Sequence, residues 1–493
     1  MIATRPVISG FHPDPSICRV GDTYYLVTSS FEYSPGVPIF RSTDLVQWEQ
    51  IGNVLDRPEH LERVGVRASG GIYAPTLRYH DEMFWMICTN VTNGPGQLIV
   101  TARDPAGPWS APTHVPEAHG IDPDLCWDES GRCWLTWSGA DAIGHGILQA
   151  QLDPASGELL TEVDVIWRGT GGQYPEGPHL YKHAEHWYLV IAEGGTERGH
   201  AVTVARAEKP NGPFQASPTN PFLTARGTDS STQNTGHADF VEGEDGGWAV
   251  VFLGARPRGS TPGWHTMGRE TFAAHLSWES GWPAIGAPIE PPKGGVVMEH
   301  LAAEKLPLSF VSPVGLPADL LYFDDGRWRL RGGSGVFVGR RQEQRYCQVR
   351  AIMPDGGALE IRIDDRNSVR AEITSASICA VATIGGIVIP LGEMPGNAGS
   401  TIELRTEPSR APEGTPEHGP DEIVVLASEG ETRIELGRID GRYFSTEVAG
   451  GFTGRMIGLS SPSADVVVEY FGYCGSDSYD ELAAADACRP VAG

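Results

Sequence analysis

The chain has 493 residues and a formal net charge of −26, with 62 glycines and 38 prolines. The length favours two or more domains, and a turn-rich composition without a long amphipathic helix favours an all-β protein. The negative charge argues against nucleic acid or an anionic membrane as a partner. No run approaches about 18 apolar residues, and the first residues, MIATRPVISG, lack the pattern of a signal peptide. The eight scattered cysteines form no CxxC motif, so we expect reduced thiols and a cytoplasmic protein.

A repeated strand–turn–strand pattern runs through the first half of the chain. In each copy a short apolar strand is followed by a polar or Gly-containing turn and a second strand rich in Tyr, Trp, Leu and Val. The five copies begin at Asp14 (DPSICRVGDTYYLVTSS), Ala74 (APTLRYHDEMFWMICTN), Asp122 (DPDLCWDESGRCWLTWSG), Glu176 (EGPHLYKHAEHWYLVIAEGG) and His237 (HADFVEGEDGGWAVVFLG). Their opening residues are separated by about 60, 48, 54 and 61 positions.

This period is typical of β-propeller blades, which are four-stranded repeats around a central axis. Five copies predict five blades, with insertions between blades lengthening the period. Because the first strand of each blade lines the axis, we expect the five opening residues to point at one central pocket. We assign residues 1–312 to this propeller domain.

The second half of the chain has a different pattern. The Pro-rich segment KLPLSFVSPVGLPAD follows the last propeller copy and indicates a domain boundary. Beyond it, ALEIRIDDRNSVRAEIT and DEIVVLASEGETRIELGRID alternate apolar and polar residues, as antiparallel strands with one solvated face do. We assign residues 313–493 to a β-sandwich domain, in which no comparable cluster of acids appears.

Three of the copies begin with an acid: Asp14, Asp122 and Glu176. The second copy has Ala74 at the same position. Three converging carboxylates admit three interpretations: binding of a hard cation such as Ca²⁺, surface or structural acids, or acid/base catalysis. The apolar contexts FHPDPSI, HGIDPDLCW and YPEGPHLY favour catalysis. In glycoside hydrolysis, two carboxylates roughly 6.5–9.5 Å apart predict inversion, whereas a pair near 5 Å predicts retention.

Longer blocks of the chain resemble glycoside hydrolase family 43, in particular its β-xylosidase and α-L-arabinofuranosidase members. The blocks are ISGFHPDPSICRVGDTYYLVTSSFEYSPGVPIFRSTDLVQWEQIG, SGGIYAPTLRYH, YPEGPHLY, AEGGTERGHAVTVAR, NTGHAD, MGRETF, FVGRRQ and GGFTGRMIGL. They are specific and extend over nearly the whole chain. The resemblance implies an all-β protein, a five-bladed β-propeller followed by a concanavalin-like β-sandwich, and an inverting single displacement.

The resemblance also implies catalytic roles. Asp14 in HPDPS matches the general base that activates the attacking water, and Glu176 in PEGPHLY matches the general acid. Asp122 in GIDPD matches a third acid, which tunes the pKa of the general acid and holds the sugar.

Further residues match substrate-binding positions of the family. Arg269 in GRETF resembles an arginine that contacts the non-reducing sugar, and Phe31 in SSFEY resembles an aromatic wall of the pocket. His237 in NTGHAD resembles an axial histidine that holds a water or, in some members, a Ca²⁺ ion. Phe452 in GGFTG resembles the residue that the sandwich domain contributes to the mouth of the pocket.

Tyr73 departs from the family pattern, which usually reads GGIWAPT where this chain has GGIYAPT. A tyrosine keeps the aromatic face of the pocket wall and adds a hydroxyl, but it covers less area than tryptophan. The preference between xylose and arabinose is therefore left open at this position.

We predict an exo-acting, inverting glycosidase that releases terminal xylose from β-1,4-xylooligosaccharides, with α-L-arabinofuranose as a further candidate product. The alternatives are an α-L-arabinofuranosidase that trims arabinan, a retaining enzyme, and a non-catalytic carbohydrate-binding propeller, which all three retained acids disfavour. The predicted chemistry requires no cofactor, and Ca²⁺ near His237 is the one metal that we consider. We expect a small oligosaccharide as the partner, and a homo-oligomer is left open.

Overall fold

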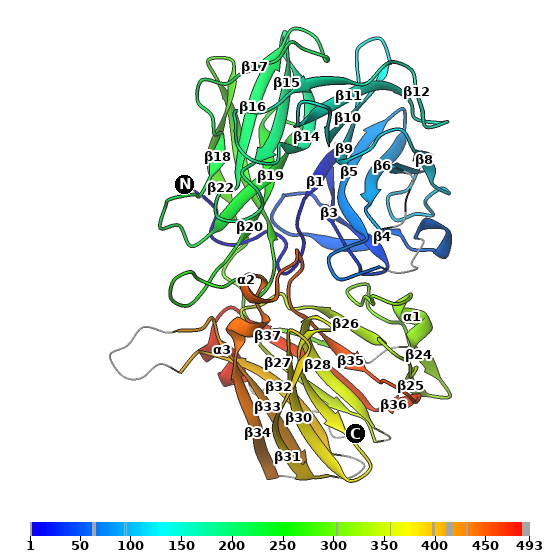
Figure 1. The fold of residues 1–493 in the computed structure, drawn as a ribbon, viewed down its shortest axis with the longest axis vertical. Helices are drawn as coiled ribbons and strands as arrows, with labels where there is room; N and C mark the ends of the chain where they lie inside the picture. The colour runs from blue at the N-terminus through cyan, green and yellow to red at the C-terminus, as the bar shows by residue number, and fades with distance from the viewer. Residues whose placement is uncertain are drawn as a thin grey trace. The chain divides into compact units, whose positions relative to one another are not determined.

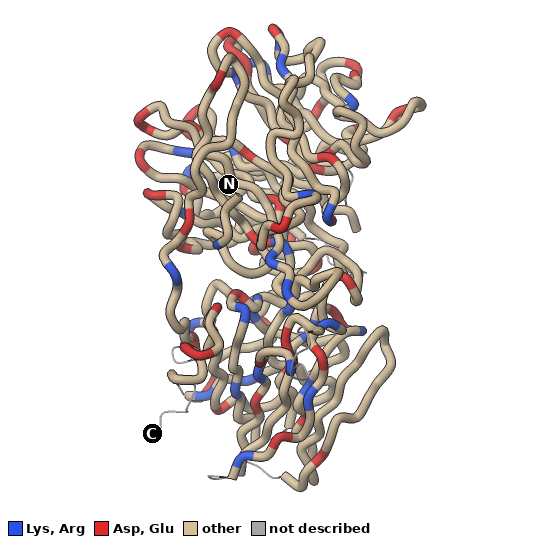
Figure 2. The backbone as a smooth tube through the Cα atoms, turned by 90° about the vertical axis from the view of Figure 1, so that its left-hand side faces the viewer, with Lys and Arg blue, Asp and Glu red and all other residues tan. Residues whose placement is uncertain are grey.

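The computed structural model describes residues 2–61, 66–92, 94, 96–301, 304–354, 356–396, 400–410, 418–429 and 432–485. The chain divides into two compact units (Figure 1), each built mainly of antiparallel strands, which confirms the predicted all-β class. The first unit comprises Met1–Ile8, His12–Ala255 and Glu270–Pro291, and the second comprises Ser9–Phe11, Arg256–Arg269 and Pro292–Gly493. Acidic residues are spread over both units (Figure 2), as the charge of −26 requires.

Each copy of the sequence repeat forms one antiparallel sheet of the first unit. The first sheet contains β1 (Ser16–Val20), β2 (Thr23–Val27), β3 (Gly36–Ser42) and β4 (Glu49–Leu55), followed by the 3₁₀ helix η1 (Pro58–His60). The second contains β5 (Ile72–His80), β6 (Met83–Asn90), β7 (Gln97–Ala102) and β8 (Thr113–Val115). The third contains β9 (Ile121–Trp127), β10 (Cys133–Ala140), β11 (His145–Asp153) and β12 (Glu158–Leu159), with β13 (Asp164–Trp167) also pairing with β11.

The remaining two sheets of the first unit follow the same plan. The fourth contains β14 (Glu176–His183), β15 (His186–Glu193), β16 (Ala201–Ala207) and β17 (Gln215–Ala216), with β18 (Leu223–Thr224) also pairing with β16. The fifth contains β19 (Gln233–Glu242), β20 (Trp248–Ala255), β21 (Glu270–Glu279) and β22 (Trp282–Ile289).

The first strands of these five sheets form a closed ring. β1 packs beside β5, β5 beside β9, β9 beside β14, β14 beside β19, and β19 beside β1 again. Each pair of neighbouring sheets shares a cluster of buried apolar side chains, including the pair formed by the fifth and first sheets. The apolar residues of the strands in these sheets are buried because neighbouring sheets cover them.

The second unit contains two six-stranded sheets and a smaller one. In spatial order, one sheet contains β23 (Val297–His300), β37 (Tyr470–Ser476), β27 (Tyr346–Ile352), β32 (Thr401–Glu407), β33 (Glu422–Glu429) and β34 (Thr432–Asp440). The other contains β26 (Phe337–Arg341), β35 (Met456–Ser460), β28 (Gly357–Asp364), β29 (Asn367–Ile373), β30 (Ser377–Ile384) and β31 (Ile387–Pro395). The smaller sheet contains β24 (Leu321–Asp324), β25 (Arg327–Leu330) and β36 (Val466–Val468). The helices are α1 (Pro317–Leu320), η2 (Gly441–Phe444), α2 (Thr446–Ala449) and α3 (Tyr479–Ala485).

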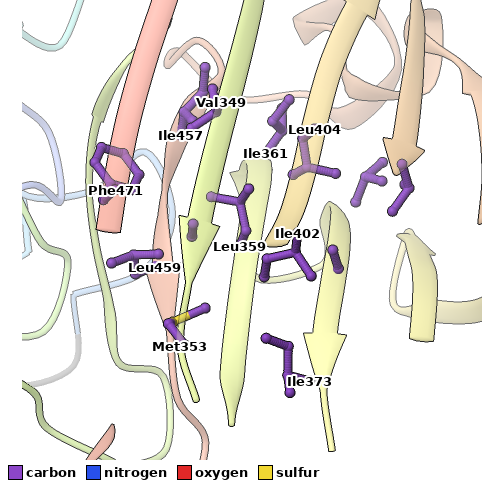
Figure 3. Close-up of a cluster of buried hydrophobic side chains, with 14 of the residues drawn as sticks. Val349, Met353, Leu359, Ile361, Ile373, Ile402, Leu404, Ile457, Leu459 and Phe471 are labelled. Atoms are coloured by element: carbon purple, nitrogen blue, oxygen red, sulfur yellow. The ribbon is translucent and has the colours of Figure 1, made fainter. Parts of the chain in front are cut away.

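Both six-stranded sheets contribute to one hydrophobic core (Figure 3). Leu404 of β32 and Leu359 of β28 belong to the same buried cluster. The intervening residues of β28 are buried as well: Glu360 and Arg362 are 5% and 7% exposed, and the Arg362 guanidinium lies 4.0 Å from the ring centroid of Phe337. This strand therefore lacks the solvated face that its alternating sequence predicts, because the polar side chains are covered too.

The division between the units differs from the predicted boundary after residue 312. Residues 292–301 and 304–312 fall in the second unit, because β23 pairs with β37 near the end of the chain. Two short segments, Ser9–Phe11 and Arg256–Arg269, also belong to the second unit although the chain on either side of them lies in the first.

The cysteines of the described residues are all free, and Cys488 lies outside the described residues. No helix in the described part of the chain is long and apolar enough to span a membrane.

Candidate active site

The opening residues of the second to fifth copies lie at or beside a β-bulge near the start of a first strand, whereas Asp14 lies two residues before β1, which pairs with β2 without a bulge. In the third sheet Asp124 pairs with Thr136, whereas Ile121 pairs with Ser138, so three steps on β9 oppose two on β10. The same irregularity occurs in the second, fourth and fifth sheets. A bulge bends its strand and re-aims a side chain, and bulges are frequent beside active sites.

Four of the predicted site residues hold a strained backbone: Phe31, with φ of 49°, and three opening residues of the copies. Asp14, Asp122 and His237 have φ values of 55°, 57° and 45°, in the left-handed region that residues other than glycine rarely adopt. Such strain costs about 1–3 kcal/mol per residue and clusters at functional sites. The equivalent bulge residues of the second and fourth sheets are Ala74 and Gly177, the latter with φ of 56°.

Glu176 is therefore one residue out of register with Asp14. The alignment of the copies predicts Glu176 at the opening position, but the pairing of β14 with β15 places Gly177 there. A Cβ atom on Gly177 would lie 2.9–3.0 Å from three atoms of the His237 ring, so no side chain fits at that position. The fourth sheet consequently supplies its carboxylate from the preceding residue.

Contacts through His237 and Gly177 bring the three predicted acids together. Nδ1 of His237 lies 3.7 Å from Oδ1 of Asp14. The N–H of Gly177 donates a hydrogen bond of 3.1 Å to Oδ2 of Asp122. Because Gly177 directly follows Glu176 and packs against the His237 ring, the backbones of the three acids converge in one part of the first unit.

The three acids differ in exposure in a way that suits different tasks. Asp14 and Asp122 are each 6% exposed, whereas Glu176 is half-buried. The hydroxyl of Ser29 donates a hydrogen bond of 2.6 Å to Oδ2 of Asp14 and orients that carboxylate. A carboxyl that must reach a leaving group needs more access than one that acts on a small water molecule.

Phe31 and Tyr73 form an aromatic pair, with ring centroids 4.9 Å apart and an interplanar angle of 59°. A two-way backbone bridge between Phe31 and Ile72 fixes the pair, with N···O distances of 2.9 and 3.0 Å. Tyr73 donates its hydroxyl to the carbonyl of Ser69 at 2.7 Å. The hydroxyl that distinguishes this chain from the family pattern therefore anchors the Tyr73 ring to its own loop.

The loop that leads into β14 is held by Glu193, which is 2% exposed. Its carboxylate accepts hydrogen bonds from the N–H and the hydroxyl of Thr170 and from the N–H of Gly172, all at 2.9 Å. It also accepts a bond of 2.6 Å from the hydroxyl of Thr203. The sequence analysis did not single out Glu193, although it stands in the block AEGGTERGH and its charge follows the apolar run WYLVIA at the end of β15.

Arg269 and Phe452 both belong to the second unit and contact each other there. The guanidinium carbon of Arg269 lies 5.7 Å from the ring centroid of Phe452, and Nη2 donates a bond of 3.5 Å to the Phe452 carbonyl. Arg269 is 7% exposed and Phe452 is 36% exposed. Their predicted contacts with a sugar remain predictions.

A protein-built calcium site is not formed by the described residues around His237. Ca²⁺ takes six to eight oxygen ligands. No group of three or more His, Cys, Asp or Glu side chains is placed to hold a metal ion within the described ranges. The donor set therefore does not fit a calcium ion held mainly by side chains.

Several known proteins are similar to this chain. A xylosidase/arabinosidase of Butyrivibrio fibrisolvens is 46% identical over 58% of this chain, and the match spans only 56% of that protein's length. A non-reducing end alpha-L-arabinofuranosidase of Bacteroides ovatus is 35% identical over 92% of this chain and 90% of its own. The crystal structure of a xylan beta-1,4-xylosidase from Bacillus halodurans superposes with a TM-score of 0.85 at 31% identity, covering 95% of this chain and 99% of that one. The model of glycosyl hydrolases family 43 matches residues 3–283, and with the strained acids of the ring this shows that the chain belongs to that family of glycosidases.

Proposed function

We propose that the protein is an exo-acting, inverting glycoside hydrolase that releases terminal xylose from β-1,4-xylooligosaccharides. The observation that carries the proposal is the convergence of Asp14, Asp122 and Glu176 around His237 and Gly177. The names of similar proteins, a xylosidase/arabinosidase and a xylan beta-1,4-xylosidase, support the substrate class.

We also propose that the five sheets of the first unit are the blades of a five-bladed β-propeller. The closed ring of first strands and the apolar cluster shared by each neighbouring pair support this architecture. For the second unit we propose a concanavalin-like β-sandwich, supported by the single core to which both six-stranded sheets contribute.

In the proposed reaction Asp14 is the general base. Its carboxylate removes a proton from a water molecule while the water oxygen attacks the anomeric carbon of the terminal sugar. Glu176 is the general acid and gives its proton to the glycosidic oxygen as the bond to the anomeric carbon breaks. The attack and the departure occur on opposite faces of the sugar, so the configuration at the anomeric carbon inverts.

Asp122 is proposed to hold the acid in place and to bind the sugar. Its hydrogen bond to the N–H of Gly177 fixes the backbone that directly follows Glu176. In the same proposal Phe31 and Tyr73 form an aromatic wall against the sugar.

Three further residues complete the proposed substrate site. We propose that His237 holds a water on the axis and that Arg269 and Phe452 contact the substrate. Arg269 is 7% exposed and its guanidinium carbon lies 5.7 Å from the ring centroid of Phe452, which suits a fixed guanidinium.

Release of α-L-arabinofuranose is the second candidate function. It is favoured by the Bacteroides ovatus protein, whose match extends over 92% of this chain and whose name specifies an alpha-L-arabinofuranosidase. The replacement at Tyr73 leaves the choice of pentose to experiment.

Proton NMR of the products from 4-nitrophenyl β-D-xyloside and α-L-arabinofuranoside tests the proposal. We expect α-xylose to appear first from the xyloside, because inversion converts the β linkage into the α product. Initial appearance of β-xylose would overturn inversion, and faster hydrolysis of the arabinofuranoside would replace xylose as the preferred sugar. Absence of hydrolysis of both would favour a non-catalytic binding protein.

A further inference from the structure

A second polar layer lies on the first strands of the ring, two residues after the equivalent positions Asp14, Ala74, Asp122, Gly177 and His237. The pairing of the first strands makes these positions equivalent in all five sheets. Each residue is at most 3% exposed and is followed by an apolar residue. The members of this layer are Ser16, Thr76, Asp124, His179 and Asp239.

Two carboxylates of this layer hold the backbone of the next sheet along the ring. Oδ2 of Asp124 on β9 accepts a hydrogen bond of 3.0 Å from the N–H of Leu180 on β14. Oδ2 of Asp239 on β19 accepts bonds of 3.0 Å from the N–H of Ile17 and 2.6 Å from the hydroxyl of Ser16, both on β1. The hydrogen bonds that Asp239 accepts close the ring, because they join the fifth sheet to the first.

Arg78 of β5 lies between the two carboxylates. Its Nη2 is 2.7 Å from Oδ1 of Asp124, and its Nη1 is 2.8 Å from Oδ2 of Asp239. The same guanidinium donates a hydrogen bond of 2.9 Å to Nδ1 of His179. The planar fork of arginine can serve three acceptors at once, which the single ammonium of lysine cannot reproduce.

The positive charge of Arg78 is essential to the hydrogen bonds that Asp124 and Asp239 accept from the neighbouring sheets. Asp124 and Asp239 are 0% exposed, and a buried carboxylate without a partner is strongly destabilised. Burial alone would raise the pKa of Asp239, but the adjacent guanidinium of Arg78 holds that pKa below its usual value. Without Arg78 the two acids would repel one another or take up protons, and either change weakens them as acceptors.

We propose that Arg78 is a positioning residue for glycoside hydrolysis. Through Asp124 it fixes β14 at the residue four positions after Glu176, and through Asp239 it fixes β1 at the residue three positions after Asp14. A displacement of about 1 Å at a reacting group can lower a rate about 10²-fold. The role given to Arg78 rests on the roles proposed for Asp14 and Glu176.

An effect on pH dependence separates this role from a purely structural one. Asp14 lies two residues before Ser16 of the polar layer, and Nη1 of Arg78 lies 3.4 Å from the Ser16 hydroxyl. Loss of a nearby positive charge raises the pKa of a carboxylate. The other titratable groups facing Arg78 and its two carboxylates are Cys18 of β1, Cys126 of β9, and His179 and Tyr181 of β14.

The test uses Arg78→Met, Arg78→Lys and the control Arg350→Met. Arg350 is a buried arginine of the second unit, with Nε 2.7 Å from Oε2 of buried Glu403. For each full-length variant we measure Tm, kcat and KM on xylobiose, and the pH profile of kcat/KM.

We expect Arg78→Met to lower Tm and to reduce kcat about 100-fold, with KM changing far less. The acidic limb of its pH profile should move upward, because Asp14 then needs a higher pH to ionise. Arg78→Lys should keep the acidic limb near its original position and still lose about tenfold in kcat, because the charge remains and the fork is lost. Arg350→Met should lower Tm alone.

A fall in Tm for Arg78→Met, with kcat and the acidic limb unchanged, would overturn the proposal. If Arg78→Met does not fold, Arg78→Lys decides: undiminished kcat overturns the role, and a tenfold loss supports it. Activity retained in Asp14→Asn and Glu176→Ala would instead refute the proposed catalytic roles. Failure of the Arg78 test alone leaves those roles standing.

Discussion

Both units bury carboxylates, but they do so in different surroundings. In the second unit Asp421 is 0% exposed and accepts bonds of 2.7 and 2.9 Å from Arg455, with a further bond of 2.9 Å from Arg258. In the first unit Asp14 has a left-handed backbone with φ of 55°, and Nδ1 of His237 lies 3.7 Å from Oδ1 of its carboxylate. One carboxylate is neutralised by two arginines, and the other is held in a strained backbone beside a titratable ring.

The difference separates burial that stabilises the fold from burial that prepares chemistry. A fully paired acid contributes to a unique packed structure, whereas strain and neighbouring titratable groups are concentrated at functional sites. Among the described residues of the second unit, Asp325 is the one non-glycine residue with a left-handed backbone, and it lies in the turn between β24 and β25. Among the described residues of the first unit there are thirteen such residues, and they include Asp14, Asp122 and His237 of the ring.

The strongest test of this difference is to neutralise one acid of each kind, Asp14 and Asp421. Asp14→Asn should reduce kcat by about 10⁴-fold, because the base is lost, and should keep the fold, because asparagine tolerates a left-handed backbone. Asp421→Asn should lower the free energy of unfolding by about 3–5 kcal/mol. Steady-state kinetics and urea unfolding measure the two effects.

The contrast between these variants would fail if Asp421→Asn lost as much kcat as Asp14→Asn while remaining folded. It would also fail if Asp14→Asn kept substantial activity on both aryl and natural substrates. Either result would show that burial in an ion pair and burial at a strained backbone position do not mark different functions.

Glu176→Ala should distinguish the acid from the base within the first unit. We expect a loss of about 10³-fold in kcat on xylobiose, because its leaving group needs a proton. The loss on 4-nitrophenyl xyloside should be about tenfold or less, because nitrophenolate leaves without one. Equal losses on the two substrates would remove Glu176 from the acid role.

Gly177→Ala tests the register of the fourth sheet with a matched control. Both Gly177 and Gly21 have a left-handed backbone, with φ of 56° and 62°, so alanine costs about 1–2 kcal/mol at either position. Only at Gly177 would the new Cβ meet the His237 ring; at Gly21 nothing lies within 4 Å. We therefore expect similar strain but a further loss of about tenfold in kcat for Gly177→Ala alone. Equal activity of the two variants in the same assay would contradict the placement of His237.

The residues of the first unit also show how far sequence predicts structure. The repeat correctly predicts an all-β chain, and its opening residues Asp14, Asp122 and His237 do share one structural position. Glu176 is misplaced by one residue, because a bulge inserts its extra residue without a signature that separates two neighbouring positions. Pairing of β23 with β37 joins residues far apart in sequence, which no local pattern reports.

The second polar layer could have been recognised from the copies themselves. Asp124, His179 and Asp239 stand in otherwise apolar strands at a fixed offset from the bulge. Their common partner Arg78 carries no such signal. It lies on β5 four residues after Ala74, whereas the other three lie two residues after the equivalent positions of their copies. Convergence of charges from several sheets is a property of the closed ring, and only the tertiary structure shows it.

The smallest expected effect concerns the ligand of His237. Treatment with a chelator should leave kcat within about twofold of its original value, because no described group of three or more acidic, His or Cys side chains is placed to hold a metal and Ca²⁺ prefers six to eight oxygens. Asp14→Asn provides the background rate in the same assay. A loss restored by Ca²⁺ and not by Mg²⁺ would show that His237 and water molecules hold the ion. The strained backbone positions of Asp14 and His237 would then serve a metal as well as a base.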